Sequence, residues 1–156
     1  MRAGNNSMAD YTDTIDLATR IHAGQKDKAG KPYIEHVSRV AEAVRAAGGS
    51  EAQVVAAYLH DAIEDTLETA QSLRASGVSA EAITLIDVLT RREGEDHTTY
   101  IARVVLTPDA IPIKVADTRD NLLEERLALL DPETRARLVT KYQHALVQLG
   151  VRPVDA

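Results

Sequence analysis

Apolar residues recur along much of the chain at spacings of three and four, which is the period of an amphipathic helix. This pattern predicts helices over residues 10–23 and 34–47, each followed by glycine, at position 24 and at positions 48 and 49. Ser50 and Gln53 have the spacing of a capping box, which predicts a third helix from there through His60. The same period predicts further helices over residues 79–89, around 100–105, from 108–112 to beyond Asn121, and after Asp131 with Pro132 in its first turn.

The segments between these helices set the predicted domain organisation. Residues 24–32 are rich in lysine and glycine and are predicted to form a loop with local positive charge. No internal repeat or linker interrupts the pattern, so residues 9–150 are predicted to fold as one compact helical bundle. Residues 1–8 lack the apolar stretch of a signal peptide and are expected to be a flexible leader. Residues 151–156 are expected to form a C-terminal tail.

Composition strengthens the helical prediction and narrows the chemistry. Of the 156 residues, 24 are alanine and five are tyrosine, and phenylalanine and tryptophan are absent. Alanine favours helices, whereas strands favour aromatic and β-branched residues, so we expect an all-α fold. Cysteine is also absent, which excludes thiol nucleophiles, cysteine-ligated zinc and iron–sulfur clusters. Any metal site must therefore use histidine, aspartate and glutamate.

Charge and hydropathy exclude two classes of partner. Lysine and arginine total 18 against 24 acidic residues, a net charge of −6, which argues against general nucleic-acid binding because that needs a basic surface. The longest apolar run, Val54 to Leu59, is far shorter than the ~18 residues that a membrane span needs. We therefore expect a cytoplasmic protein without a nucleic-acid or membrane partner. The sequence does not set its oligomeric state.

Candidate chemistry gathers at the end of the third predicted helix. An almost wholly apolar segment runs into four ionisable residues, His60, Asp61, Glu64 and Asp65. Removing charges from water costs several kcal/mol per ion unless they are paired or bound to metal, and no lysine or arginine occurs between positions 45 and 74. Helical spacing places Glu64 one turn beyond His60 and Asp65 one turn beyond Asp61. The pattern indicates a cation supplied from elsewhere, with a metal ion as one candidate.

A lone His-Asp pair is weak support for a metal site, because such pairs also occur at exposed helix ends. Two further polar residues, His36 and Asp117, stand in apolar helical segments. Together the chain offers imidazoles and carboxylates in the order H…HD…D.

This order resembles the HD superfamily of metal-dependent phosphohydrolases. The flanking segments are similar to the hydrolase domain of RelA/SpoT-type alarmone enzymes over roughly residues 10–147, in the stretches 22–25, 28–36, 59–66 and 113–117 with Asn121. The similarity leaves no room for a synthetase domain, so a small stand-alone alarmone hydrolase is expected. The resemblance implies an all-α enzyme that uses manganese to remove the 3′-pyrophosphate of guanosine 3′,5′-bis(diphosphate).

The resemblance also implies a role for each matching residue. Glu64 and Asp65 match the catalytic acidic pair that orients the attacking water and takes its proton. Lys28 matches a basic loop residue near the substrate, and Asn121 matches a contact to its sugar and phosphates. Mixed imidazole and carboxylate donors suit Mn²⁺, with Fe²⁺ and Zn²⁺ also compatible. The implied metal ligands are His36, His60, Asp61 and Asp117.

The sequence departs from the family pattern in the basic loop. The family typically has arginine against the guanine base where this chain has Asp27. One hypothesis is therefore that the chain discriminates guanine less sharply and that Asp27→Arg improves binding of the guanosine alarmone. In the other, Asp27 itself accepts hydrogen bonds from the base. A second departure is Arg119-Asp120-Asn121 in place of Leu-His-Asn, which bears on a substrate contact. Tyr33 is assigned to the substrate pocket, where it either stacks on a base or braces His36.

Several roles and function classes stay open at this point. His22 is either catalytic or a helix-end residue, Lys114 either supports the carboxylates or lies on the surface, and Arg91 either reaches a phosphate or is solvated. An HD phosphohydrolase acting on another nucleotide or phosphoester is compatible with the motifs. A non-catalytic sensor is disfavoured by the presence of both Glu64 and Asp65. A helical adaptor without a small ligand would need a large exposed apolar patch.

Overall fold

A computed structural model describes residues 10–152, and these are helical with connecting turns. An isolated bridge between Lys26 and Pro32 is the only β pairing within that range, so the all-α prediction is confirmed. The predicted leader, residues 1–8, lies outside the described residues, as do residues 153–156 of the predicted tail. The helices are α1 (Thr12–Ile21), α2 (Tyr33–Ala46), α3 (Glu51–Leu59), α4 (Ala62–Asp65), α5 (Ala70–Ala75), α6 (Ala80–Leu89), α7 (His97–Val105), the 3-10 helix η2 (Pro108–Ala110), α8 (Ile111–Asn121), α9 (Glu124–Leu127) and α10 (Pro132–Gln148).

Local sequence signals explain where several of these helices begin. The Ser50 hydroxyl accepts from the Gln53 amide N–H at 3.1 Å, and the Gln53 side chain accepts from the Ser50 N–H at 2.8 Å, so the predicted capping box starts α3. Asp131 accepts from the Thr134 N–H at 2.9 Å and starts α10. Both predictions are confirmed.

The third predicted helix differs from the structure at its functional end. Helix α3 ends at Leu59, and α4 begins at Ala62 after Asp61, whose φ of −100° and ψ of 1° leave the helical range. Neighbouring side chains on a regular helix point in different directions. The break instead allows His60 and Asp61 to face one centre, and it interrupts at Asp61 the helical spacing that was expected between His60 and Asp65.

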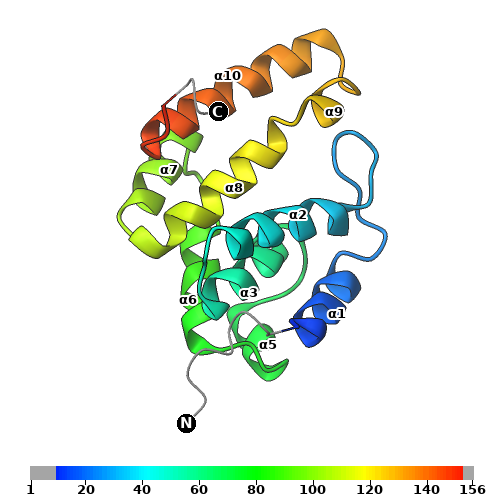
Figure 1. Cartoon of the computed structure of the whole chain (residues 1–156), viewed down its shortest axis with the longest axis vertical. Coiled ribbons are helices and arrows are strands. Elements are labelled where there is room, and N and C mark those ends of the chain that lie inside the picture. The colour runs from blue at the N-terminus through cyan, green and yellow to red at the C-terminus, as the bar shows by residue number, and fades with distance from the viewer. Residues whose placement is uncertain (1–9, 153–156) are drawn as a thin grey trace.

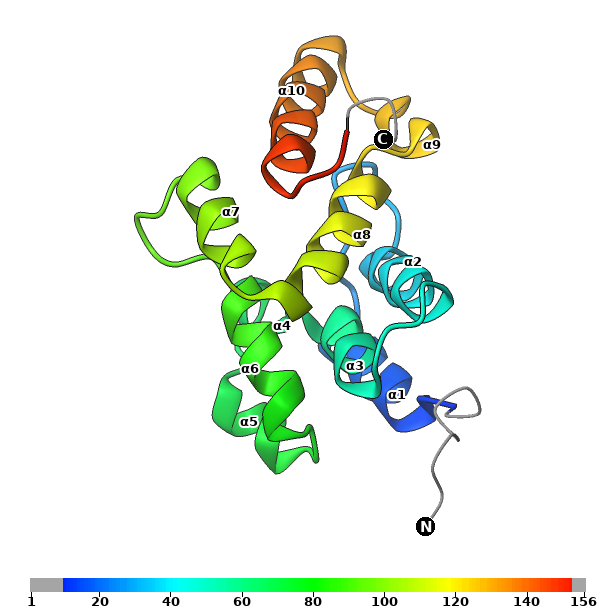
Figure 2. The ribbon, with the colours of Figure 1, turned by 60° about the vertical axis from the view of Figure 1, so that its left-hand side comes forward.

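The core lies where α2, α3, α6 and α8 pack together. Helix α2 packs against α3 and α8, and α3 also packs against α6. Figure 2 shows α8 between α2 and α7, with α10 above it. A continuous cluster of buried apolar side chains runs from α1 to α10 and includes Val40, Leu59, Ile86 and Ile113. None of the helices within residues 10–152 has the length and apolar character to cross a membrane.

The loop between α1 and α2 is held in a defined shape and lies beside α9 (Figure 1). The carboxylate of Asp27 accepts from the Ala29 and Lys31 backbone N–H groups, each at 2.9 Å. Gly30 has a φ of 83°, a left-handed conformation that glycine adopts without strain. The predicted loop is thus ordered by its own Asp27, and it forms one wall of the pocket described next.

Candidate metal centre and its pocket

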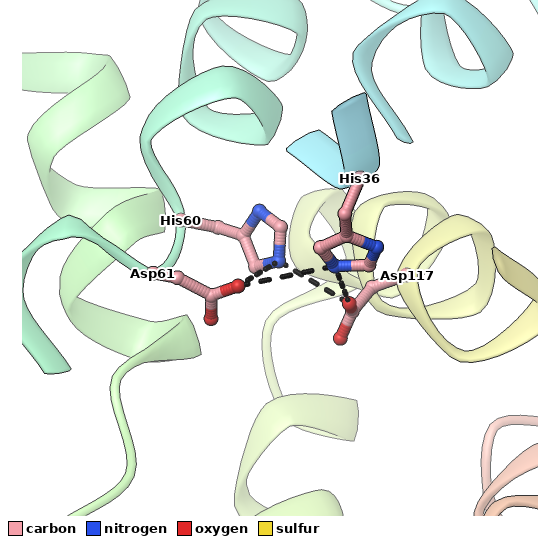
Figure 3. A group of neighbouring side chains, drawn as sticks. All are labelled: His36, His60, Asp61 and Asp117. Carbon is pink, nitrogen blue, oxygen red and sulfur yellow. Dashed lines mark hydrogen bonds and ion pairs between the residues drawn. The ribbon is translucent and has the colours of Figure 1, made fainter. Parts of the chain in front are cut away.

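Four predicted ligands converge from separate helices on one point (Figure 3). His36 comes from α2 and Asp117 from α8, while His60 and Asp61 occupy the break between α3 and α4. One donor atom from each residue lies within 4.8 Å of the donor atoms of the other three. Both imidazoles and Asp117 are buried. The folded chain therefore brings together the four residues that the motif order singled out.

The distances fit a shared cation. Nε2 of His36 lies 2.9 Å from Oδ1 of Asp117, and Nε2 of His60 lies 3.3 Å from the same oxygen. Nδ1 of His60 is 2.7 Å from the Ala57 carbonyl oxygen, so this nitrogen donates and Nε2 is left facing the carboxylates. That Nε2 is buried without a hydrogen-bond partner. An imidazole nitrogen without a hydrogen-bond partner, placed between two carboxylates, is a donor arrangement that suits a divalent metal ion.

Electrostatics within the cluster keep the carboxylates ionised. Burial disfavours the charged form of Asp61, but His60 outweighs it and lowers the Asp61 pKa to about 2. Burial likewise opposes ionisation of Asp117, yet Lys114 and His60 hold its pKa well below the usual value. For His60, burial is outweighed by Asp61 and Asp117, which raise its pKa well above normal. Because a metal ion needs the neutral imidazole, protons compete with a metal ion for this site.

A carboxylate that the sequence analysis did not assign to the site orients His36. Oδ2 of Asp120 lies 2.6 Å from Nδ1 of His36, and Asp120 also accepts from Nε of Arg39 at 2.7 Å. A ligating histidine usually has such a partner on its second nitrogen, because this fixes the ring and its tautomer. The sequence signal was the position of Asp120, one turn beyond Asp117 on the same helix.

Two other side chains support the ligands from the pocket side. Lys114 lies 2.8 Å from Oδ2 of Asp117 and is 12% exposed, so it supports a carboxylate and is not a free surface lysine. The Tyr33 hydroxyl donates to Oδ2 of Asp61 at 2.5 Å, and its ring centroid lies 5.3 Å from that of His36. Tyr33 therefore contacts Asp61 directly, and its ring lies near His36, the residue that the bracing hypothesis named.

The predicted acidic pair is anchored beside the cluster. Glu64 accepts from the Arg91 backbone N–H at 2.8 Å, and Asp65 accepts from the Gln25 amide at 3.2 Å. Gln25 in turn lies 2.8 Å from Nδ1 of His22, which is buried. Burial and the nearby Asp61 raise the pKa of Asp65. His22 thus reaches Asp65 through Gln25, an arrangement that neither sequence hypothesis for this histidine included.

These residues open onto a cavity of about 360 Å³. The predicted substrate residues Lys28, Asn121, Asp27 and Tyr33 all line it, together with Asp61, Glu64, Asp65 and Asp117. Its cationic lining consists of Lys26, Lys28, Arg91, Lys114, Arg126 and Lys141. The cavity therefore carries an acidic metal-facing end within a basic surround.

The basic residues act on one another across the cavity. Burial, followed by Lys28 and Lys114, lowers the pKa of Lys141. Burial and then Lys141 and Lys114 lower the pKa of His97 to about 4, so this lining residue is neutral at neutral pH. Lys141 was not found from sequence because it lies in the amphipathic pattern of the last helix without a motif. Lysines that repel one another in this way favour an anionic ligand between them.

Asp27 makes contacts that neither of the hypotheses about it included. They assumed an accessible carboxylate, whereas the side chain is 2% exposed and both of its oxygens are engaged. Oδ1 holds the loop backbone, and Oδ2 accepts from Nε of Arg126 at 3.2 Å. Asp27→Arg would remove these contacts and oppose Arg126, so the predicted gain in binding is no longer expected. Any contact of Asp27 with a base stays a prediction.

The family model described as the HD domain matches residues 14–119, which include all four clustered ligands. The chain belongs to the HD-domain family. The HD domain implies a divalent metal ion, and the His/Asp cluster fits one.

Curated relatives of this HD domain are longer proteins. It is 31% identical to a probable GTP pyrophosphokinase of Mycobacterium leprae over 88% of this chain and 18% of the relative. It is 28% identical to a probable guanosine-3′,5′-bis(diphosphate) 3′-pyrophosphohydrolase of Synechocystis sp., over 87% and 19%, and 32% identical to a Haemophilus influenzae protein named for the same hydrolase, over 78% and 19%. The chain thus spans about a fifth of these relatives.

A solved structure shares the fold. It is described by the words "a metazoan ortholog of SpoT hydrolyzes ppGpp and plays a role in starvation responses". The superposition has a TM-score of 0.75 at 23% identity and covers 96% of this chain and 88% of that chain. The helical HD arrangement is therefore common to both proteins.

Proposed function

We propose that this HD domain is a metal-dependent phosphohydrolase that removes the 3′-pyrophosphate of guanosine 3′,5′-bis(diphosphate). The observation that carries the proposal is that Asp61 and Asp117 of the four-donor cluster line the same cavity as the carboxylates of Glu64 and Asp65 and six basic side chains. The activity named for the Synechocystis and Haemophilus relatives supports the same reaction.

Manganese is the proposed ion, because two imidazoles and two carboxylates suit a metal of its hardness. The ion would be held by His36, His60, Asp61 and Asp117. When bound, it supplies Lewis acidity that lowers the pKa of the attacking water and offsets charge at phosphorus. Asp120 and Tyr33 hold the ligands His36 and Asp61 in place.

Glu64 and Asp65 are proposed to orient the water and accept its proton. Their anchors, the Arg91 backbone and the Gln25 side chain, limit the directions in which the carboxylates can point. A general base must hold such a position because proton transfer requires contact within hydrogen-bond reach. The burial that raises the pKa of Asp65 also makes it a stronger proton acceptor than an exposed aspartate.

The lysines of the cationic lining, together with Arg91, are proposed to bind the two diphosphate groups. A bis(diphosphate) is a compact polyanion, and lysine and arginine in a partly enclosed cavity attract it more strongly than they would at an open surface. Lys28 contributes to the lowered pKa of Lys141 across the cavity, which supports a shared ligand between them. Asn121 is proposed to contact the nucleotide from the end of α8. A cytoplasmic location and the absence of a nucleic-acid partner stay predictions from composition.

A substrate screen tests this function. The purified protein is incubated with guanosine and adenosine 3′,5′-bis(diphosphates), nucleoside triphosphates and simple phosphomonoesters, each with Mn²⁺ and with EDTA. We expect release of pyrophosphate from the guanosine bis(diphosphate), abolished by EDTA. If the protein prefers another of these compounds, the proposed substrate is wrong but the proposed enzyme class is kept. A metal-loaded protein that hydrolyses none of them would contradict the proposal and favour a sensor.

A further inference from the structure

Arg126 is a largely buried arginine that joins the loop to the metal side of the pocket. Its side chain is 15% exposed, and Nε and Nη2 lie 3.2 and 3.1 Å from Oδ2 of Asp27. On its other edge, Nη1 lies 2.9 Å from Oδ2 of Asp120, 2.9 Å from Oδ1 of Asn121 and 3.1 Å from Nδ1 of His36. One planar group therefore holds two carboxylates that are 93 positions apart in the chain, at 27 and 120.

Each carboxylate controls a different part of the pocket. Asp27 fixes the loop that carries Lys28, because its other oxygen accepts from the Ala29 and Lys31 N–H groups. Asp120 fixes the ring of His36 through Nδ1, while Nε2 of that ring faces the metal cluster. Arg126 thus contacts the residue that shapes the basic loop and the residue that orients a metal ligand.

The element that carries Arg126 is suited to this task. Helix α9 is short, and Leu127, which is 4% exposed, anchors it next to Arg126. Arg39 gives an internal comparison, because it binds Asp120 through Nε and Nη2, is 41% exposed, and acts on Asp27 through its charge and not through a hydrogen bond. The two arginines share one carboxylate and differ in their contact with the loop.

We propose that Arg126 is a positioning residue that sets metal affinity through Asp120 and nucleotide affinity through Asp27. Because its guanidinium has a fixed fork, the two edges hold Asp27 and Asp120 at one relative placement. The proposal rests on the proposed function for the identity of the nucleotide. The placement of Arg126 on both carboxylates, and its effect on metal affinity, do not depend on turnover.

The test uses Arg126→Gln, Arg39→Gln, Asp27→Asn and the double variant Asp27→Asn/Arg126→Gln. Calorimetry measures two dissociation constants for each protein, that of Mn²⁺ alone and that of guanosine 3′,5′-bis(diphosphate) in EDTA, where no turnover occurs. Thermal unfolding of the metal-free proteins is recorded alongside. Arg126→Lys is included because it keeps the charge and loses the fork.

We expect Arg126→Gln to weaken both kinds of binding, Arg39→Gln to weaken only Mn²⁺ binding, and Asp27→Asn to weaken only nucleotide binding. The Mn²⁺ effect should reach at most the ~10–100-fold that loss of a direct partner of a metal ligand costs. In the double variant, the nucleotide effects should be less than additive, because both changes break the same contact. Arg126→Lys should recover part of either the Mn²⁺ affinity or the nucleotide affinity but not of both, because a lysine lacks the fork that contacts both carboxylates.

Two results would overturn the proposal. In the first, Arg126→Gln or Arg126→Lys lowers the unfolding temperature but leaves both dissociation constants at the wild-type values. Arg126 would then be only a structural residue of α9. Fully additive nucleotide effects in the double variant would show that Asp27 and Arg126 act independently. If wild-type protein binds the nucleotide but fails to hydrolyse it with Mn²⁺, the proposed function is lost while these binding tests keep their meaning.

Discussion

Glu64 and Asp65 line the same cavity as Asp61 and Asp117, but neither of them is one of the four clustered donors. Replacing either carboxylate by its amide, Glu64→Gln or Asp65→Asn, should therefore leave Mn²⁺ binding intact and slow hydrolysis by about 10²–10⁴-fold, the usual share of a general base. Glu81→Gln in α6 makes the same chemical change at an exposed site away from the cavity and serves as the control. Near-native turnover in both cavity variants would make these carboxylates structural.

The contact between Gln25 and Asp65 predicts a shift in the pH profile. Burial and Asp61 raise the pKa of Asp65, and the Gln25 hydrogen bond opposes this by favouring the ionised form. Gln25→Leu should raise the Asp65 pKa further, so the acid limb of kcat against pH at saturating Mn²⁺ moves to higher pH. The same change in an Asp65→Asn background should cause no such shift. An unmoved acid limb in the single variant would show that Asp65 is not the base whose titration limits the rate.

For individual residues, the sequence predicts the four proposed metal ligands but not the side chains that keep those ligands in position. His36, His60, Asp61 and Asp117 stand in a recognisable order within apolar segments, so they can be assigned before folding. Arg126 and Asp27 lie 99 positions apart, and their contact depends on how α9 packs against the loop. No periodicity or local motif carries that information. The contact also shows why an acidic residue is accommodated at position 27.

Among the elements, α3 depends on its N-terminal cap. Ser50→Ala removes the acceptor for the Gln53 N–H and should lower the free energy of unfolding by about 0.5–2 kcal/mol, as measured by denaturant unfolding. Ser50→Gly is the matched control, because glycine at this position costs only a few tenths of a kcal/mol. Equal stability of the alanine variant and the wild type would mean that tertiary packing alone fixes the start of α3.

How well each helix could be predicted depends on how many residues its apolar pattern covers. Long helices such as α2 and α10 bury a continuous apolar stripe, so their existence is clear from sequence. Helices α5 and α9 were not predicted, since six and four residues are too few to establish a period. Thr69 and Ser72 do form a capping box at α5, a signal that was present and missed. The break at Asp61 is set by the convergence of ligands and has no local signal.

For the whole molecule, we expect metal binding to increase the stability of the fold. An ion that binds only the folded protein stabilises it by about 2.7 kcal/mol at 100 times its dissociation constant, which corresponds to roughly 5–11 °C in the unfolding temperature of a domain this size. EDTA should remove this gain, and His60→Ala should abolish the difference between Mn²⁺ and EDTA. An identical melting curve in Mn²⁺ and EDTA, with no metal found by elemental analysis, would contradict the site.

The same gain should depend on pH in a defined direction. Burial opposes protonation of His60, but Asp61 and Asp117 outweigh it, so the pKa in the metal-free protein lies above that of the unfolded chain. The proton therefore stabilises the metal-free fold at low pH, and this contribution is lost as the pH rises through the raised pKa. Since metal binding needs the neutral imidazole, the difference between Mn²⁺ and EDTA should be larger at pH 8 than at pH 6.

The most direct test of the central claim follows the oxygen of the attacking water. Wild-type protein is incubated with guanosine 3′,5′-bis(diphosphate) and Mn²⁺ in H₂¹⁸O, and the products are analysed by mass spectrometry. Attack at the 3′-phosphorus predicts one ¹⁸O atom in the released pyrophosphate, none in the guanosine 5′-diphosphate, and no product with EDTA. Absence of turnover by metal-loaded protein, release of inorganic phosphate in place of pyrophosphate, or ¹⁸O in the nucleotide would contradict the account.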